Sequence, residues 1–164
     1  MIKVKICGIT NFTDAIHAAE LGADALGFVF VKSSPRFIKP SDASKIIGKL
    51  PPFLSKVGLF VNPSIEEVRK VMDMCHFDFI QFHGDESPSF CEQFNLPYIK
   101  AISVESDLSL LEYEKNYVSA SAFLLDSFSE DARGGTGKIF DWNLIPQNTS
   151  KPIIVAGGLN KDNL

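Results

Sequence analysis

Hydrophobic residues recur along the chain in short runs, and a polar turn and a helical pattern follow most of them. The runs that we expect to form strands are residues 2–7, 25–30, 56–61, 78–82, 97–101, 121–126 and 152–155. Runs such as ALGFVF and FDFIQF are almost wholly apolar, which is typical of parallel strands covered on their outer face by helices. The pattern therefore predicts an α/β fold built from repeated strand–helix units.

Two segments between these runs carry clear helix signals. In TDAIHAAELG, Thr10 or Asn11 can serve as the cap, and Gly22 would end the helix. In PSIEEVRKVMDMC, Ser64 is the expected cap, and Glu67 follows at the spacing of a capping box. A repeat of about two dozen residues without a long antiparallel stretch favours a (β/α)8 barrel over an open doubly wound sheet.

The repeat stops early for such a barrel. The sequence ends in AGGLNKDNL, where the seventh helix should begin, whereas a complete barrel needs at least about 200 residues. We therefore expect residues 1–164 to form a single barrel domain that is incomplete at its C-terminus, with strand 8 and the last helices missing. The alternative is that another chain supplies the last unit.

Composition limits the classes of partner. With 164 residues, 45% hydrophobic and 22% charged, the chain is typical of one soluble globular domain. A net charge of −4 disfavours nucleic acid and anionic membranes, but it allows a small phosphorylated ligand in a local basic pocket. The longest apolar run, ALGFVFV, is too short to span a bilayer, and no signal-peptide pattern is present, so we expect a cytoplasmic protein.

Several chemically active residues stand where the predicted strands end. Barrel enzymes build their active sites at the carboxyl ends of the strands. Each residue alone has an ordinary explanation in packing or solvation, but their convergence at one end of an apolar barrel predicts a functional site. These residues are Cys7, Arg36, His83, Asp126, Gly157 and Gly158.

Cys7 lies on the same face of its strand as Lys5, because side chains alternate along a strand. Lys5 is therefore a candidate for favouring the reactive thiolate form of Cys7. The ordinary alternative is that Cys7 is a small buried apolar residue. The three cysteines fit neither a disulfide framework nor a zinc site, so we expect reduced thiols.

Two polar stretches adjoin these positions. Residues 127–138 form a long glycine-rich segment directly after Asp126, and we expect a loop that covers the site. Asp85 and Glu86 look like a pair of catalytic carboxylates. They stand where the fourth helix should begin, so we expect them instead to interact with the helix dipole.

Six motifs, taken in order, resemble one known family. The motifs are KICGIT, LGFVF followed by SPR, GLFVN, QFHGDE, LLDS with GGTGK, and AGGL. Together they resemble phosphoribosylanthranilate isomerase, a barrel enzyme of tryptophan biosynthesis. The resemblance implies an Amadori rearrangement of a small phosphorylated substrate, N-(5-phosphoribosyl)anthranilate, without cofactor or metal. It is compatible with a monomer or a homodimer.

The resemblance assigns a role to each matching residue. Cys7 matches the general base of the family and Asp126 its general acid, which must be protonated in part to open the ribose ring. Arg36 matches the residue that pairs with the anthranilate carboxylate. Gly157 and Gly158 match one half of the phosphate site, whose other half belongs to strand 8 in the family.

The motif histidine, His83, is expected to support substrate binding. Two alternatives stay open at this point. One is the related sugar-phosphate barrel isomerase of histidine biosynthesis, which has an aspartate where this chain has Cys7. The other is a non-catalytic barrel remnant that binds phosphate or pairs with a second chain.

Overall fold

The strands form one parallel sheet in the order β1-β2-β3-β4-β5-β6-β7. The computed structural model describes residues 2–104, 110–127, 142, 145 and 148–163. The strands are β1 (Lys5–Cys7), β2 (Ala25–Val29), β3 (Ser55–Phe60), β4 (Phe79–Phe82), β5 (Tyr98–Val104), β6 (Ala122–Ser127) and β7 (Ile153–Val155). The helices are α1 (Phe12–Glu20), α2 (Pro40–Ile47), α3 (Ile65–Met74), α4 (Pro88–Cys91), the 3-10 helix η1 (Glu92–Phe94) and α5 (Leu110–Asn116).

All the strands expected from the hydrophobic pattern are present, and the parallel α/β prediction is confirmed. Strand β1 is shorter than expected, because the Val4 amide donates to the side chain of Asp24 at 2.8 Å before regular pairing with β2 begins. Strand β5 is longer than expected, because it pairs with β6 as far as Val104 and Ser127.

The helix caps follow the local sequence signals. Of the two expected caps for α1, it is Asn11 that accepts a hydrogen bond from the amide of Asp14, at 2.9 Å. Ser64 and Glu67 form the expected capping box at the start of α3. Local hydrogen bonding therefore accounts for where both helices begin.

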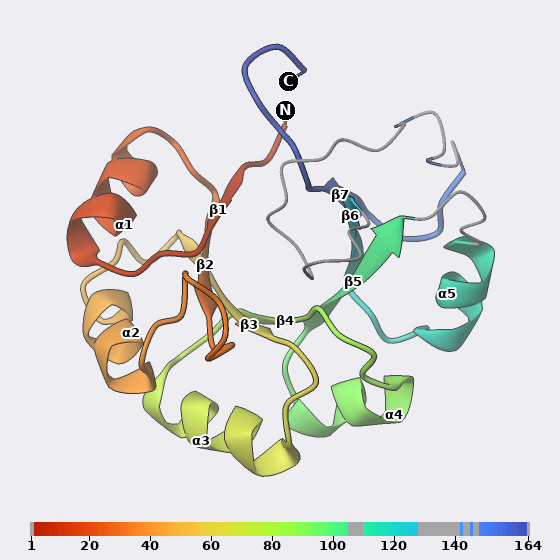
Figure 1. The fold of residues 1–164 in the computed structure, drawn as a ribbon, viewed down its shortest axis with the longest axis horizontal. Helices are drawn as coiled ribbons and strands as arrows, with labels where there is room; N and C mark the ends of the chain where they lie inside the picture. The colour runs from red at the N-terminus through yellow and green to blue at the C-terminus, as the bar shows by residue number, and fades with distance from the viewer. Residues whose placement is uncertain (1, 105–109, 128–141, 143–144, 146–147, 164) are drawn as a thin grey trace.

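The sheet is curved, with the helices α1 to α5 around its outer side (Figure 1). The main apolar core lies between the strands and the helices, and a smaller cluster around Ile99, Ala122 and Leu124 faces the other way. Alternation along the strands puts Gln81 and Asp126 on the inner face together with this smaller cluster.

A hydrogen bond across the inner face reflects the curvature. Lys5 of β1 donates to Gln81 of β4 at 2.6 Å, although β2 and β3 lie between these strands in the sheet. In a flat sheet the two strands would be about 14 Å apart. Curvature thus brings together side chains from strands that are not neighbours.

Among the described residues, no helix has the length and apolar character that crossing a membrane requires.

Candidate functional site

Asp126 is a buried carboxyl group near the carboxyl end of β6. The residue is 5% exposed, and its Oδ1 accepts a hydrogen bond from the backbone N–H of Ser127 at 2.9 Å. Its Oδ2 lies 3.2 Å from Nε2 of His83, which follows β4. The structure therefore brings two of the predicted site residues into direct contact.

His83 has a second polar partner that the sequence analysis did not single out. Its Nδ1 lies 3.1 Å from Nε2 of Gln81, whose Oε1 accepts from Nζ of Lys5 at 2.6 Å. Lys5 therefore bonds Gln81, and its expected favouring of the thiolate form of Cys7 stays a prediction. The one polar residue within FIQF, the sequence of β4, was the signal that could have identified Gln81.

Cys7 ends β1, and its thiol is partly exposed. Its strand neighbour is Gly27 of β2, where a Cβ atom would lie only 2.6 Å from Sγ of Cys7. The absence of a side chain at Gly27 therefore leaves the space that the thiol occupies.

Arg36 is exposed on the loop after β2, and its aliphatic carbons lie over Gly8. A Cβ atom at Gly8 would collide with Cγ and Cδ of Arg36. This places the arginine stem beside the residue that follows Cys7. The role of the Arg36 guanidinium group in binding the substrate stays a prediction.

The first glycine of the pair after β7 lies against the carboxyl group of Asp126. Gly157 has φ of +81°, and a Cβ atom there would lie 2.6 Å from Oδ1 of Asp126 and 2.7 Å from the backbone nitrogen of Ser127. The carbonyl oxygen of Gly158 accepts from the side-chain amides of Asn160 and Asn163, both at 3.1 Å. A role of the two glycines in binding phosphate stays a prediction.

Glu86 and Lys100 form a buried ion pair below the loop that carries His83. Lys100 donates to Glu86 at 3.2 Å and to the carbonyl oxygen of Gly84 at 2.6 Å. Glu86 in turn accepts from the backbone amides of Asn62, at 2.7 Å, and Gly84. The pair therefore joins the segments that follow β3 and β4 to the side chain of Lys100 in β5.

This ion pair corrects the sequence-based interpretation of Glu86. The expectation that it interacts with a helix dipole is wrong, because Ser87 caps α4 and the first turn of the helix contains no acidic residue. Its actual partner, Lys100, is distant in the sequence and is 2% exposed. A lysine within the apolar run YIKAI was the available signal.

All three cysteines are free thiols, but their environments differ. Burial raises the pKa of Cys75 to about 11 and that of Cys91 to about 12, because a thiolate loses its hydration in the core. Both belong to the main core, whereas Cys7 ends a strand at the polar end of the sheet.

The loop that we expect to cover the site, residues 127–138, lies outside the described residues apart from Ser127.

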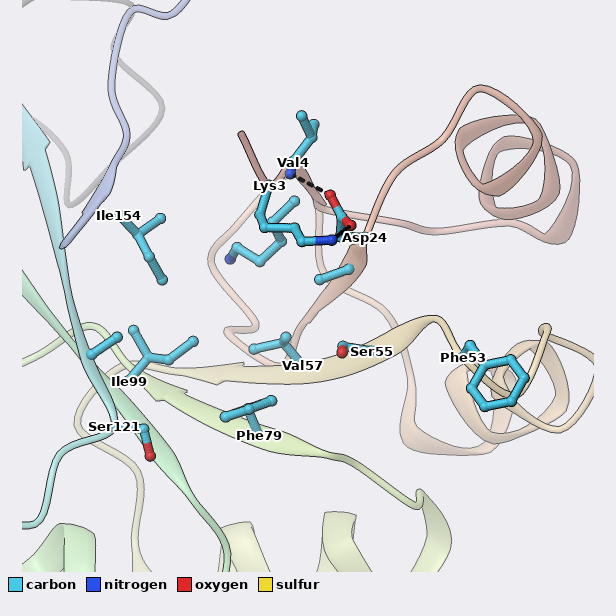
Figure 2. Close-up of a pocket in the computed structure, with 13 residues that line it drawn as sticks. Lys3, Val4, Asp24, Phe53, Ser55, Val57, Phe79, Ile99, Ser121 and Ile154 are labelled. Atoms are coloured by element: carbon cyan, nitrogen blue, oxygen red, sulfur yellow. Dashed lines mark hydrogen bonds and ion pairs between the residues drawn. The ribbon is translucent and has the colours of Figure 1, made fainter. Parts of the chain in front are cut away.

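A cavity of about 470 Å³ lies at the other end of the sheet, where the strands begin. Figure 2 shows Ile99, Val57 and Ile154 around this cavity, and the carboxylate of Asp24 bonded to Val4 at its rim. Its lining contains none of Cys7, His83 or Asp126.

The described residues contain no cluster of three or more histidine, cysteine or acidic side chains suited to a metal ion.

The structure combines a curved parallel sheet with helices on its outer side, and titratable groups lie at the carboxyl ends of the strands. These features define the class of barrel-type α/β proteins with a candidate acid–base site. A family model described as N-(5'phosphoribosyl)anthranilate (PRA) isomerase matches residues 4–164. The chain belongs to this family. The alternative assignment, to the related sugar-phosphate isomerase of histidine biosynthesis, is therefore not favoured.

Individual relatives agree with the family match. The N-(5'-phosphoribosyl)anthranilate isomerase of Nitrosomonas eutropha is 50% identical over 163 residues, which cover 99% of this chain and 78% of the relative. The crystal structure of phosphoribosyl anthranilate isomerase from Thermotoga maritima has a TM-score of 0.88 and 38% identity, over 99% of this chain and 80% of that chain.

A third similar protein was crystallised with a ligand. It is a phosphoribosyl anthranilate isomerase in complex with reduced 1-(o-carboxyphenylamino)-1-deoxyribulose 5-phosphate. Its TM-score is 0.72 with 42% identity, over 78% of this chain and 66% of that chain.

Proposed function

We propose that this chain catalyses the Amadori rearrangement of N-(5-phosphoribosyl)anthranilate to 1-(2-carboxyphenylamino)-1-deoxyribulose 5-phosphate. The observation that carries the proposal is the family match over residues 4–164, a span that includes every proposed site residue. The complex of a similar enzyme with a reduced form of this product supports the choice of substrate.

In the proposed mechanism, Asp126 is the general acid and Cys7 the general base. The carboxyl group of Asp126 gives its proton to the ring oxygen of the ribose, the C1′–oxygen bond breaks, and a Schiff base forms. The thiolate of Cys7 then takes the proton from C2′, and the resulting enolamine tautomerises to the ketone. General acid–base catalysis of this kind contributes about 10²–10⁴-fold to the rate.

Substrate binding is assigned to Arg36, His83, Gly157 and Gly158. The guanidinium group of Arg36 is proposed to pair with the anthranilate carboxylate through parallel hydrogen bonds. Its position beside Gly8, next to the proposed base, supports this role. The backbone at Gly157 and Gly158 is proposed to contribute to binding the phosphate.

We also propose that the residues form one domain and that the sheet belongs to a (β/α)8 barrel. The single parallel sheet and the similarity to solved isomerases support both proposals. The small phosphorylated substrate is the proposed partner. Location in the cytoplasm and a monomeric or homodimeric state stay predictions.

The test is to replace the proposed acid and base separately. Cys7→Ala and Asp126→Ala should each lower kcat by about 10²–10⁴-fold with little change in KM, because each group acts on a proton in the transition state. The fluorescence change of freshly made substrate measures turnover. Cys75→Ala and Asp42→Ala are matched controls away from the site, and near-normal turnover in either test variant contradicts the assignment.

A further inference from the structure

Gln81 is a buried amide whose two polar ends both have partners. It is 1% exposed on the inner face of β4, where an unpaired amide would be costly. Its Oε1 lies 2.6 Å from Nζ of Lys5, and its Nε2 lies 3.1 Å from Nδ1 of His83. The amide therefore links β1 to the residue that follows β4.

The lysine determines which way the amide faces. An ammonium group has only donors, so the atom of Gln81 that faces Lys5 must be the carbonyl oxygen. The NH₂ group then faces His83, and because it is only a donor, Nδ1 of His83 must be an acceptor without hydrogen. In a neutral imidazole the single proton is consequently on Nε2, which lies 3.2 Å from Oδ2 of Asp126.

We propose that Lys5 and Gln81 are positioning residues that hold His83 as its neutral Nε2–H tautomer, so that this N–H faces the Asp126 carboxyl group. A second proton on Nδ1 would point at the NH₂ group of Gln81. Protonation of His83 therefore requires the amide to turn away from Lys5.

The consequence for catalysis rests on the proposed function. With Nδ1 accepting from Gln81, the N–H of the imidazole faces Oδ2 of Asp126 and orients the carboxyl group that is the proposed acid. His83 contributes a donor to the carboxyl oxygen through Nε2. Lys5 acts through Gln81, to which it donates a hydrogen bond at 2.6 Å.

The first measurement needs no variant. The chain has three histidines, so long-range ¹H–¹⁵N correlation spectra of ¹⁵N-histidine-labelled protein are simple enough to assign, with His83→Gln identifying the His83 signals. At neutral pH we expect Nδ1 of His83 to have the shift of an unprotonated nitrogen and Nε2 that of a protonated one. A proton on Nδ1 in the parent protein overturns the proposal.

The second measurement uses Lys5→Met and Gln81→Leu. Without the ammonium group the amide can turn, and without the amide Nδ1 loses its donor, so both variants should move Nδ1 of His83 toward the protonated shift. Gln93→Leu is the matched control, because the Gln93 side chain is exposed and bonds only the carbonyl oxygen of Ser89 among the described contacts. It should leave the His83 signals unchanged.

Kinetics separate a positioning role from general support of the fold. We expect Gln81→Leu to lower kcat by about tenfold with KM changed less than about twofold. Unchanged His83 shifts in a folded Lys5→Met protein overturn the proposal whatever the activity. If the shifts move as stated but the protein does not convert the substrate, the proposed function fails and the assigned tautomer stands.

Discussion

Replacing Gly27 with alanine tests whether the position of the Cys7 thiol matters for turnover. The added Cβ atom would lie 2.6 Å from Sγ of Cys7, whereas an ordinary contact needs about 3.5 Å or more. The thiol must therefore move by about 1 Å. A displacement of this size in a reacting group can cost about 100-fold in rate, which corresponds to about 2.7 kcal/mol of transition-state stabilisation.

We expect kcat/KM of Gly27→Ala to fall by about 100-fold in the substrate fluorescence assay. Overpacking should also lower the free energy of unfolding by about 1–3 kcal/mol, so unfolding in urea must be measured beside activity. Gly58→Ala is the matched control, because a Cβ atom at Gly58 meets the ring of Phe77 at 3.0 Å, away from the proposed site.

The control should lose stability but keep its turnover. Two results would refute the reasoning: near-parental activity in a folded Gly27→Ala protein, or an equal loss of activity in both variants. The rate of alkylation of Cys7 gives a second measure, since a displaced thiol should react at an altered rate.

Two further predictions concern the buried groups. Lys100→Met should lower the free energy of unfolding by about 3–5 kcal/mol, because the buried Glu86 loses its cationic partner. Adding Glu86→Gln should recover part of the loss, and strictly additive losses in urea unfolding would contradict this. Because the pKa of Cys75 is raised to about 11 and that of Cys91 to about 12, the folded state retains thiol protons that the unfolded state releases near pH 9.0. Stability should therefore fall as pH rises from about 9 toward 12, measured as Tm by circular dichroism, and a Cys75→Ala/Cys91→Ala variant should show a shallower fall.

The sequence by itself determined the elements and their type. Apolar runs of strand length predicted every strand of the sheet, and the cap signals at Asn11 and Ser64 located the starts of two helices. These features are local, because a strand run or a cap depends on residues within a few positions of one another. The order of the motifs was likewise enough to identify the family.

Tertiary structure decided which side chains meet. The alternation along β1 correctly put Lys5 on the face of Cys7, but the hydrogen-bond partner of Lys5 is Gln81, 76 positions away. Glu86 looked like a helix-start residue, yet its charge is neutralised by Lys100 from the next strand. Such contacts depend on the curvature of the sheet and on the register between strands, and residues nearby in the sequence encode neither.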